Sequence, residues 1–173
     1  RLSLVGSEMC IRDSNKGSKF KWAADLEERN KLWQARWDVY YSVKALVNNG
    51  RVYSTDVCVP ISRITECVKF AEVEVNKIGL RAPMVGHLGD GNFHVLFPYD
   101  PNDKEIYKKI REFSNKLIDK TLELKGTITG EHGVGLHKKS YLLKEHPDNI
   151  PLMKTIKRSI DPNNIMNPCL LYT

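Results

Sequence analysis

The sequence lacks any long run of apolar residues. A helix that crosses a bilayer needs roughly 20 consecutive apolar residues, so no transmembrane segment is predicted. Hydrophobic residues make up 41% of the 173 positions and charged residues 28%, which is typical of a soluble globular protein. A chain of this length can bury the core of one domain.

The sequence also lacks a block of like charges. Its formal net charge of +6 comes from 27 basic residues that are interleaved with 21 acidic ones. No basic stripe alternates with exposed aromatic residues, so a nucleic-acid partner is not predicted. The charges are interpreted as a solvated surface, with the steering of small anions as the alternative.

Cysteines are few, and none of the four stands in a CxxC spacing. They do not indicate a disulfide framework, so a reducing or neutral compartment is favoured. The two ends of the chain, residues 1–14 (RLSLVGSEMCIRDS) and 169–173 (CLLYT), resemble translated adapter sequence from a cDNA library. We interpret both as non-native tails on a fragment whose domain is residues 15–168, which leaves Cys58 and Cys67 as native cysteines.

The spacing of apolar residues predicts an α+β fold. Helices are predicted over residues 25–47, 62–79, 100–126 and 149–160, and strands over 51–60, 82–87, 92–97 and 127–129. From residue 51 the order is strand, helix, strand, strand, helix, strand. This is the ferredoxin-like (split βαβ) pattern, an antiparallel sheet with helices packed on one face, here with flanking N-terminal and C-terminal helices.

Local signals set the ends of these helices. Ser62 is predicted to cap the second helix, whose apolar stripe includes Cys67 and which Gly79 ends. Asp100 and Pro101 are predicted to start the third helix, which Gly126 closes.

Arg36 interrupts the apolar stripe of the first predicted helix. One interpretation is an arginine that lays its aliphatic stem along the core and reaches solvent. The other is that Arg36 points at an anion, because a buried guanidinium needs a carboxylate or phosphate partner. The sequence leaves both open.

Two glycine-rich segments carry the histidines of interest, Gly86–His94 (GHLGDGNFH) and Gly130–Gly135 (GEHGVG). Neither contains GxxxxGK(S/T) or a GxGxxG between a strand and a helix, so nucleotide-binding fingerprints are absent. His87 and His94 flank the turn of a predicted hairpin, and a third strand can deliver Glu131 to the same edge. Two imidazoles and one carboxylate are the ligands of a catalytic transition-metal site with an open position.

His132 follows Glu131 directly, and we expect that position to bend it out of the ligand set and leave it as a general base. Asp90 and Asn92 are interpreted as turn residues, with support of the metal ligands as the alternative. His137 and His146, which stand among lysines and prolines, are expected at the surface.

These motifs, together with Asp161–Pro168 (DPNNIMNP), Tyr53–Ser62 (YSTDVCVPIS) and Leu32–Arg36 (LWQAR), resemble the C-terminal part of the FAD-linked oxidase family. The likeness covers roughly residues 20–168 and is strongest to the mitochondrial D-lactate dehydrogenase branch of eukaryotes. It implies a flavoenzyme that oxidises a D-2-hydroxy acid, with a mitochondrial location and an electron acceptor such as a cytochrome.

By this resemblance, His87, His94 and Glu131 hold Zn or Mn, and His132 takes the substrate hydroxyl proton. Arg36 matches the arginine that grips the substrate carboxylate. Asn167 matches an asparagine close to the FAD, which is bound mainly by a domain upstream that is absent from this sequence.

The sequence departs from one branch of the family. Where the hydroxyglutarate enzymes have a lysine and a second polar residue for a distal carboxylate, this sequence has Ser54 and Leu96. A short substrate such as D-lactate is therefore preferred. The alternative function is a non-catalytic ferredoxin-like module that binds a metal or a small ligand for regulation.

Overall fold

A computed structural model describes residues 23–168, so both predicted tails lie outside the described residues. The chain divides into two compact units, one that ends at Val39 and one that begins at Tyr40. Within residues 23–168, no helix is both long enough and apolar enough to cross a membrane.

The first predicted helix is α2 (Leu26–Lys44), and Asp25 caps it by accepting a 2.8 Å hydrogen bond from the Glu28 N–H. Its predicted apolar stripe is largely exposed, with Trp33 48% and Tyr40 46% accessible, while Val43 is buried. The helix carries apolar side chains on several sides, and so it has no single inward face. Because this face of α2 is not buried, the position of Arg36 on it gives no support to the interpretation that Arg36 binds an anion.

The second unit is built on an antiparallel sheet of four strands, in which three strands pair with the same central strand, β4. A pair of strands, β1 and β2, follows one edge of β4 in succession, and β3 follows the other edge. An isolated bridge joins Thr127 to Cys58 beyond β2. The strands are β1 (Arg51–Ser54), β2 (Val57–Cys58), β3 (Met84–His87) and β4 (Asn92–Tyr99).

If β1 and β2 are taken as one strand broken at Thr55 and Asp56, this is the predicted split βαβ order. The final strand of that pattern is reduced to the Thr127 bridge, so the prediction of a strand over residues 127–129 was wrong in extent. The chain leaves the sheet after Thr127 because the backbone N–H groups of residues 130–132 donate to the Asp56 carboxylate instead of to a neighbouring strand.

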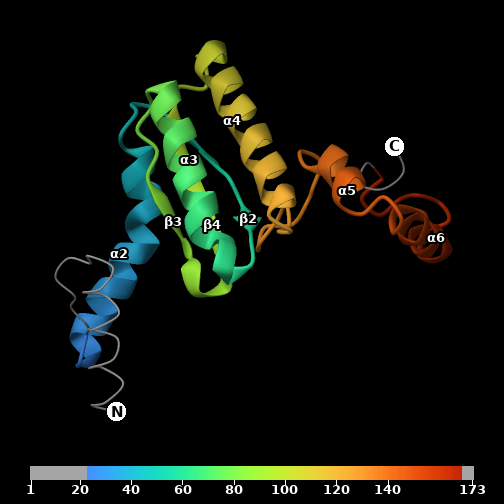
Figure 1. The fold of residues 1–173 in the computed structure, drawn as a ribbon, viewed down its shortest axis with the longest axis horizontal. Coiled ribbons are helices and arrows are strands. Elements are labelled where there is room, and N and C mark those ends of the chain that lie inside the picture. Colours follow the sequence, from blue (N-terminus) through green and yellow to red (C-terminus); the bar gives the residue numbers. More distant parts are fainter. Residues whose placement is uncertain (1–22, 169–173) are drawn as a thin grey trace. The chain divides into compact units, whose positions relative to one another are not determined.

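Helices α3 (Ile64–Ile78) and α4 (Lys104–Glu123) lie side by side over one face of the sheet (Figure 1). Because side chains alternate along a strand, the odd positions of β4 face these helices and the even positions face away. The core between sheet and helices consists of Val57, Val59, Cys67, Ala71, Val75, Phe93, Val95, Phe97, Ile110, Phe113, Leu117, Ile118, Leu124 and Ile128. Cys67 is thus the core residue that its spacing predicts.

Several predicted helix ends differ in detail. A 3₁₀ turn, η1 (Ile61–Arg63), precedes α3, so Ser62 does not cap that helix. Asp103, not Asp100, caps α4 by accepting a 2.9 Å bond from the Ile106 N–H. Past the end of α4, Lys125 takes the left-handed conformation, with φ 61°, in place of Gly126.

Two shorter helices follow. The first, α5 (Lys139–Glu145), was not predicted, because it is brief and begins without a capping side chain. The second, α6 (Ile150–Ile160), matches the predicted terminal helix and has a proline in its first turn. Between the Thr127 bridge and α5 runs the loop that carries Glu131 and His132.

The hairpin between β3 and β4 turns through a second 3₁₀ segment, η2 (Leu88–Asp90), and ends at Gly91 with φ 81°. A Cβ at Gly91 would lie 1.9 Å from the Val59 backbone oxygen. Glycine is therefore required here both for its conformation and for the approach of the two backbones.

We predict that Gly91→Ala destabilises the chain by more than about 2 kcal/mol, because positive-φ strain adds to a backbone collision. Gly79 is the matched control: it has φ 74° with nothing within 4 Å of its missing Cβ. Gly79→Ala should cost only about 1 kcal/mol. Urea denaturation of the two variants measures both values, and equal losses would contradict the collision.

Candidate functional site

His94 lies on β4, at an even position on the face away from α3 and α4. Its side chain is only 8% exposed, and its Nδ1 lies 2.8 Å from the Thr55 backbone oxygen. Because a carbonyl can only accept, Nδ1 carries a proton and donates to Thr55. The other ring nitrogen, Nε2, lies 2.6 Å from Oε1 of Glu131.

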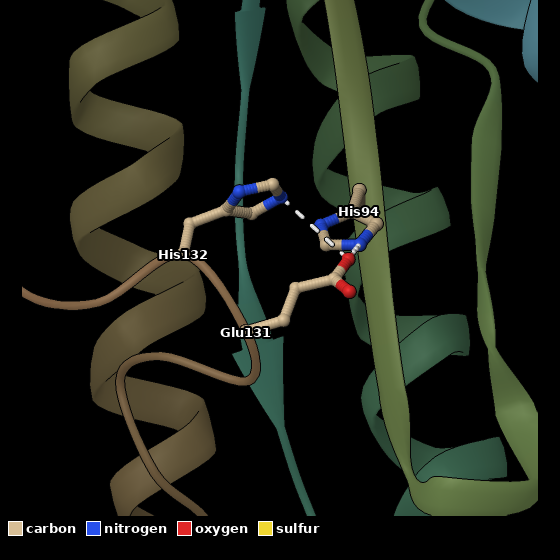
Figure 2. A group of neighbouring side chains, drawn as sticks. All are labelled: His94, Glu131 and His132. Atoms are coloured by element: carbon tan, nitrogen blue, oxygen red, sulfur yellow. Dashed lines mark hydrogen bonds and ion pairs between the residues drawn. The ribbon is translucent and has the colours of Figure 1, made fainter.

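Glu131 and His132 reach the same place from the loop that follows the Thr127 bridge. Figure 2 shows both side chains turned toward His94 on β4. Nε2 of His132 lies 3.6 Å from Oε1 of Glu131, and the rings of His132 and His94 meet edge to face with centroids 5.2 Å apart. One ligand atom from each of the three residues falls within 4.8 Å of the others.

His87 approaches the other side of the Glu131 carboxylate. It ends β3, and its Nε2 lies 3.8 Å from Oε2 of Glu131. Along the hairpin His87 is opposite Asn92, and His94 is opposite Val85, so the two histidines are diagonal neighbours on one face of the sheet. Of the predicted ligands, Glu131 therefore meets His94 and His87, but His87 is not in the group whose ligand atoms all lie within 4.8 Å of one another. His132 takes part in that group instead of being bent away.

The loop is held by a residue that sequence reasoning missed, Asp56. Its side chain is 3% exposed and accepts hydrogen bonds from the backbone N–H groups of Gly130 (3.0 Å), Glu131 (3.2 Å) and His132 (2.9 Å). The Thr129 hydroxyl donates a further bond of 2.8 Å. Three consecutive amides on one carboxylate fix the backbone from which both loop side chains of the site project.

The ionisation of Asp56 follows from these contacts. Burial by itself would raise the pKa of this carboxyl group, because it disfavours the charged form. The bonds from the His132 N–H and the Thr129 hydroxyl, with the Lys138 ammonium nearby, outweigh burial and lower the pKa from 3.8 to about 2. Asp56 is therefore an anion throughout the neutral range.

Lys138 supplies the balancing charge. Its Nζ lies 3.7 Å from the Asp56 carboxylate and donates to the backbone oxygens of Asp56 (2.8 Å) and Ile128 (2.7 Å). Burial lowers the pKa of Lys138, and the attraction of Asp56 offsets this only in part. The Lys138 ammonium thus bonds both to the break between β1 and β2, at Asp56, and to Ile128, at the start of the loop.

A motif could have pointed to Asp56. In YSTDVCVPIS it is the one charged residue inside a β-rich segment, and a buried charge in a strand needs a dedicated set of partners.

The prediction that Asn92 is a turn residue was wrong: it lies on β4 and is 5% exposed. Asp90, by contrast, is in the turn segment η2.

Two further predicted site residues are on other elements of the chain. Arg36 is on α2, in the first compact unit, and its role stays a prediction. Asn167 lies beyond α6 with φ 48° and an exposed side chain, and its role likewise stays a prediction. His137 is exposed, as predicted, and His146, which follows α5, has 41% of its side chain exposed.

The donor set fits a divalent transition metal. With Nδ1 of His94 committed to a carbonyl, Nε2 presents its lone pair to a carboxylate oxygen, and two such atoms stay close only if a proton or a cation lies between them. The backbone bond from Nδ1 is the arrangement that orients metal-binding histidines in general. Imidazole and carboxylate together suit Zn or Mn.

Comparison with known proteins decides the family. The sequence profile described as "FAD linked oxidases, C-terminal domain" matches residues 9–171. The chain belongs to this family. Its α+β fold and four-stranded antiparallel sheet agree with membership.

Individual relatives agree with this assignment. A probable mitochondrial D-lactate dehydrogenase from Danio rerio is 44% identical over 94% of this chain and 33% of its own length. Mitochondrial D-lactate dehydrogenases (cytochrome) from Arabidopsis thaliana and Saccharomyces cerevisiae are 35% and 34% identical, over 91% and 98% of this chain. The chain spans 28% and 30% of those two relatives, so it corresponds to about a third or less of the proteins it resembles.

We predict that Asp56→Asn lowers the stability of this chain at pH 7 by about 2–4 kcal/mol, because an amide group would turn a donor toward backbone N–H groups and leave them unpaired. The folded carboxyl has a pKa of about 2 against 3.8 unfolded, so its contribution is present above pH 4 and is lost as pH falls toward 2. Denaturant titrations at several pH values measure the difference between the two proteins.

That difference should shrink by about 2 kcal/mol between pH 5 and pH 2, since each pKa unit is worth about 1.4 kcal/mol. Asp148→Asn, at an exposed position, is the control and should change stability by less than about 0.5 kcal/mol. A constant difference across this range would mean that Asp56 is not the ionised acceptor described above.

Proposed function

We propose that this chain is the substrate and metal domain of a flavin-dependent D-2-hydroxy-acid dehydrogenase that oxidises D-lactate to pyruvate. The convergence of His94, Glu131 and His132, with His87 beside them, carries this proposal. The names of the relatives supply the substrate class, a mitochondrial location and a cytochrome as electron acceptor. FAD held by another part of the protein would accept the hydride from C2 of the substrate.

His87, His94 and Glu131 are the proposed ligands of Zn or Mn. A bound divalent ion would act as a Lewis acid that polarises the substrate hydroxyl. His94 contributes Nε2 with its tautomer set by Thr55, and Glu131 contributes a carboxylate that faces one histidine with each oxygen. These groups come from two strands and one loop, so the site depends on the sheet and on the Asp56 bonds.

His132 is the proposed general base. Its side chain is 63% exposed, whereas that of His94 is 8% exposed, so His132 can meet a substrate that enters from solvent. Its Nε2 would receive the hydroxyl proton while the C–O bond of lactate becomes the carbonyl of pyruvate. The backbone bond to Asp56 keeps the imidazole within reach of the Glu131 carboxylate.

The preference for a short substrate has a structural counterpart. Ser54 and Leu96, the positions that lack partners for a second carboxylate, are opposite one another on β1 and β4. They share the face of the sheet that carries His94, because Leu96 is two positions along β4. Leu96 is buried and apolar, and the Ser54 hydroxyl donates to the neighbouring Thr55 oxygen.

Metal analysis of the full-length protein tests the ligand roles. We predict that His94→Ala, Glu131→Ala and His87→Ala each reduce the Zn or Mn content of the protein below about a tenth of stoichiometric, because each removes a side chain that binds the ion. His132→Gln should keep the metal but slow flavin reduction by D-lactate about 10²–10⁴-fold, as expected for loss of a base. Elemental analysis and stopped-flow flavin absorbance give the two readouts.

The same measurements separate the alternatives. If His132→Gln lost the metal and His87→Ala kept it, the two histidines would exchange roles. If D-lactate failed to reduce a flavin in the full-length protein while the metal stayed stoichiometric, the chain would be the regulatory module and not part of a dehydrogenase.

Arg36 is the proposed partner of the substrate carboxylate, on the strength of the family resemblance. We predict that Arg36→Lys in the full-length protein raises KM for D-lactate about tenfold, because a lysine cannot form the paired bonds of a guanidinium. Arg29→Lys, on the same helix, is the control and should leave KM unchanged. Equal KM values for the two variants would remove Arg36 from the substrate site.

A further inference from the structure

Lys138 stands where α5 begins, and its side chain reaches back from there to the loop of the site. The helix fixes its backbone, because its carbonyl accepts hydrogen bonds of 3.0 Å from the N–H groups of Tyr141 and Leu142. Its side chain is 18% exposed, so most of it lies inside the protein. A buried ammonium is costly unless its N–H groups find acceptors, and the acceptors therefore show what the residue is for.

Lys138 holds the loop at both ends. Its backbone N–H donates to the Val134 oxygen at 3.2 Å, at the end of the loop, and its Nζ donates to the Ile128 oxygen at 2.7 Å, at the start. The N–H of Ile128 is bonded to α5 as well, because it donates to the Glu145 carboxylate at 3.1 Å. Both ends of the segment that carries the two loop side chains of the site are thus tied to one short helix.

The Lys138 ammonium also reaches the strand side of the site. Nζ donates to the Asp56 backbone oxygen at 2.8 Å and lies 3.7 Å from the Asp56 carboxylate. That carboxylate holds the amides of residues 130–132, and the preceding residue, Thr55, accepts from Nδ1 of His94. Lys138 therefore connects the anchor of the loop to the anchor of the buried histidine.

We propose that Lys138 is a positioning residue that holds the loop side chains of the site, Glu131 and His132, against β4. This inference rests on the proposed function, because the position of these side chains matters to the reaction only if they act in it. A buried ion pair adds little to the stability of a fold, since desolvation offsets the attraction of the charges. The bonds of Lys138 are better explained by the segments that they hold in place.

Hydrogen exchange in the full-length protein tests the positioning and needs no metal. Lys138→Met keeps an unbranched stem but removes the charge and the donors of Nζ. Peptides that contain residues 128–134 should exchange at least about tenfold faster, because the loop opens more easily, while peptides from α3 should keep their rate. An unchanged loop would overturn the proposal, and so would equal acceleration in α3, which indicates a general loss of stability.

A milder variant covers the case in which Lys138→Met does not fold. Lys138→Gln loses the charge but keeps an amide donor for a backbone oxygen, so the loop should exchange about threefold faster, again without change in α3. The same two results, an unchanged loop or equal acceleration in α3, would overturn the proposal with this variant.

Metal binding connects this role to the site. Zn²⁺ titrated into the metal-free full-length protein against a coloured chelator should bind about tenfold more weakly to Lys138→Met, because a ligand is held less well. Co²⁺ bound in place of Zn²⁺ should show shifted visible bands, which follow the geometry of the ligands. Lys144→Met is the matched control: its ammonium, on the same helix, pairs with Asp119 at the surface, and its loss should change neither readout.

The readouts distinguish this proposal from the proposed function. If the unaltered protein binds neither Zn²⁺ nor Co²⁺, the metal site is wrong, and the exchange comparison alone decides whether Lys138 holds the loop. If the unaltered protein binds Zn²⁺ and Lys138→Met binds it equally well with the same Co²⁺ spectrum, Lys138 is not a positioning residue.

Discussion

The site depends on the bonds between the Asp56 carboxylate and the amides of Gly130, Glu131 and His132. An amide that is buried without an acceptor is costly, and so is a carboxylate that is buried without donors. Here each satisfies the other, and Lys138 balances the charge. The loop therefore keeps a defined path although it belongs to no strand or helix, and the side chains of Glu131 and His132 project from it at fixed positions.

The break between β1 and β2 makes this possible. Within a regular strand the backbone N–H and C=O groups of Thr55 and Asp56 would pair with the neighbouring strands of the sheet. At the break the Thr55 carbonyl orients His94, the Thr55 hydroxyl accepts from the Val95 N–H at 2.9 Å, and Asp56 turns to the loop. An interruption of two residues thus connects the central strand to the loop, and side chains from both meet at His94.

The sequence predicted what depends on periodicity and glycine. The stripe of α3 and its end at Gly79, the hairpin around Gly91 and the split βαβ order all follow from local patterns. It did not predict the role of Asp56: the β-rich segment around it marks a charge that needs partners, but those partners lie more than seventy residues away and cannot be identified locally. It also misjudged α2, because apolar spacing indicates a helix without stating what covers it.

The expectation that His132 is bent out of the cluster failed for a reason that explains the site. Adjacent residues of a strand point to opposite faces, so Glu131 and His132 on a strand could not both reach His94. The chain leaves the sheet after Thr127, and the side chains of Glu131 and His132 both turn toward His94 (Figure 2). Two residues that are adjacent in sequence can then both reach His94, because Asp56 replaces the strand that would have paired with them.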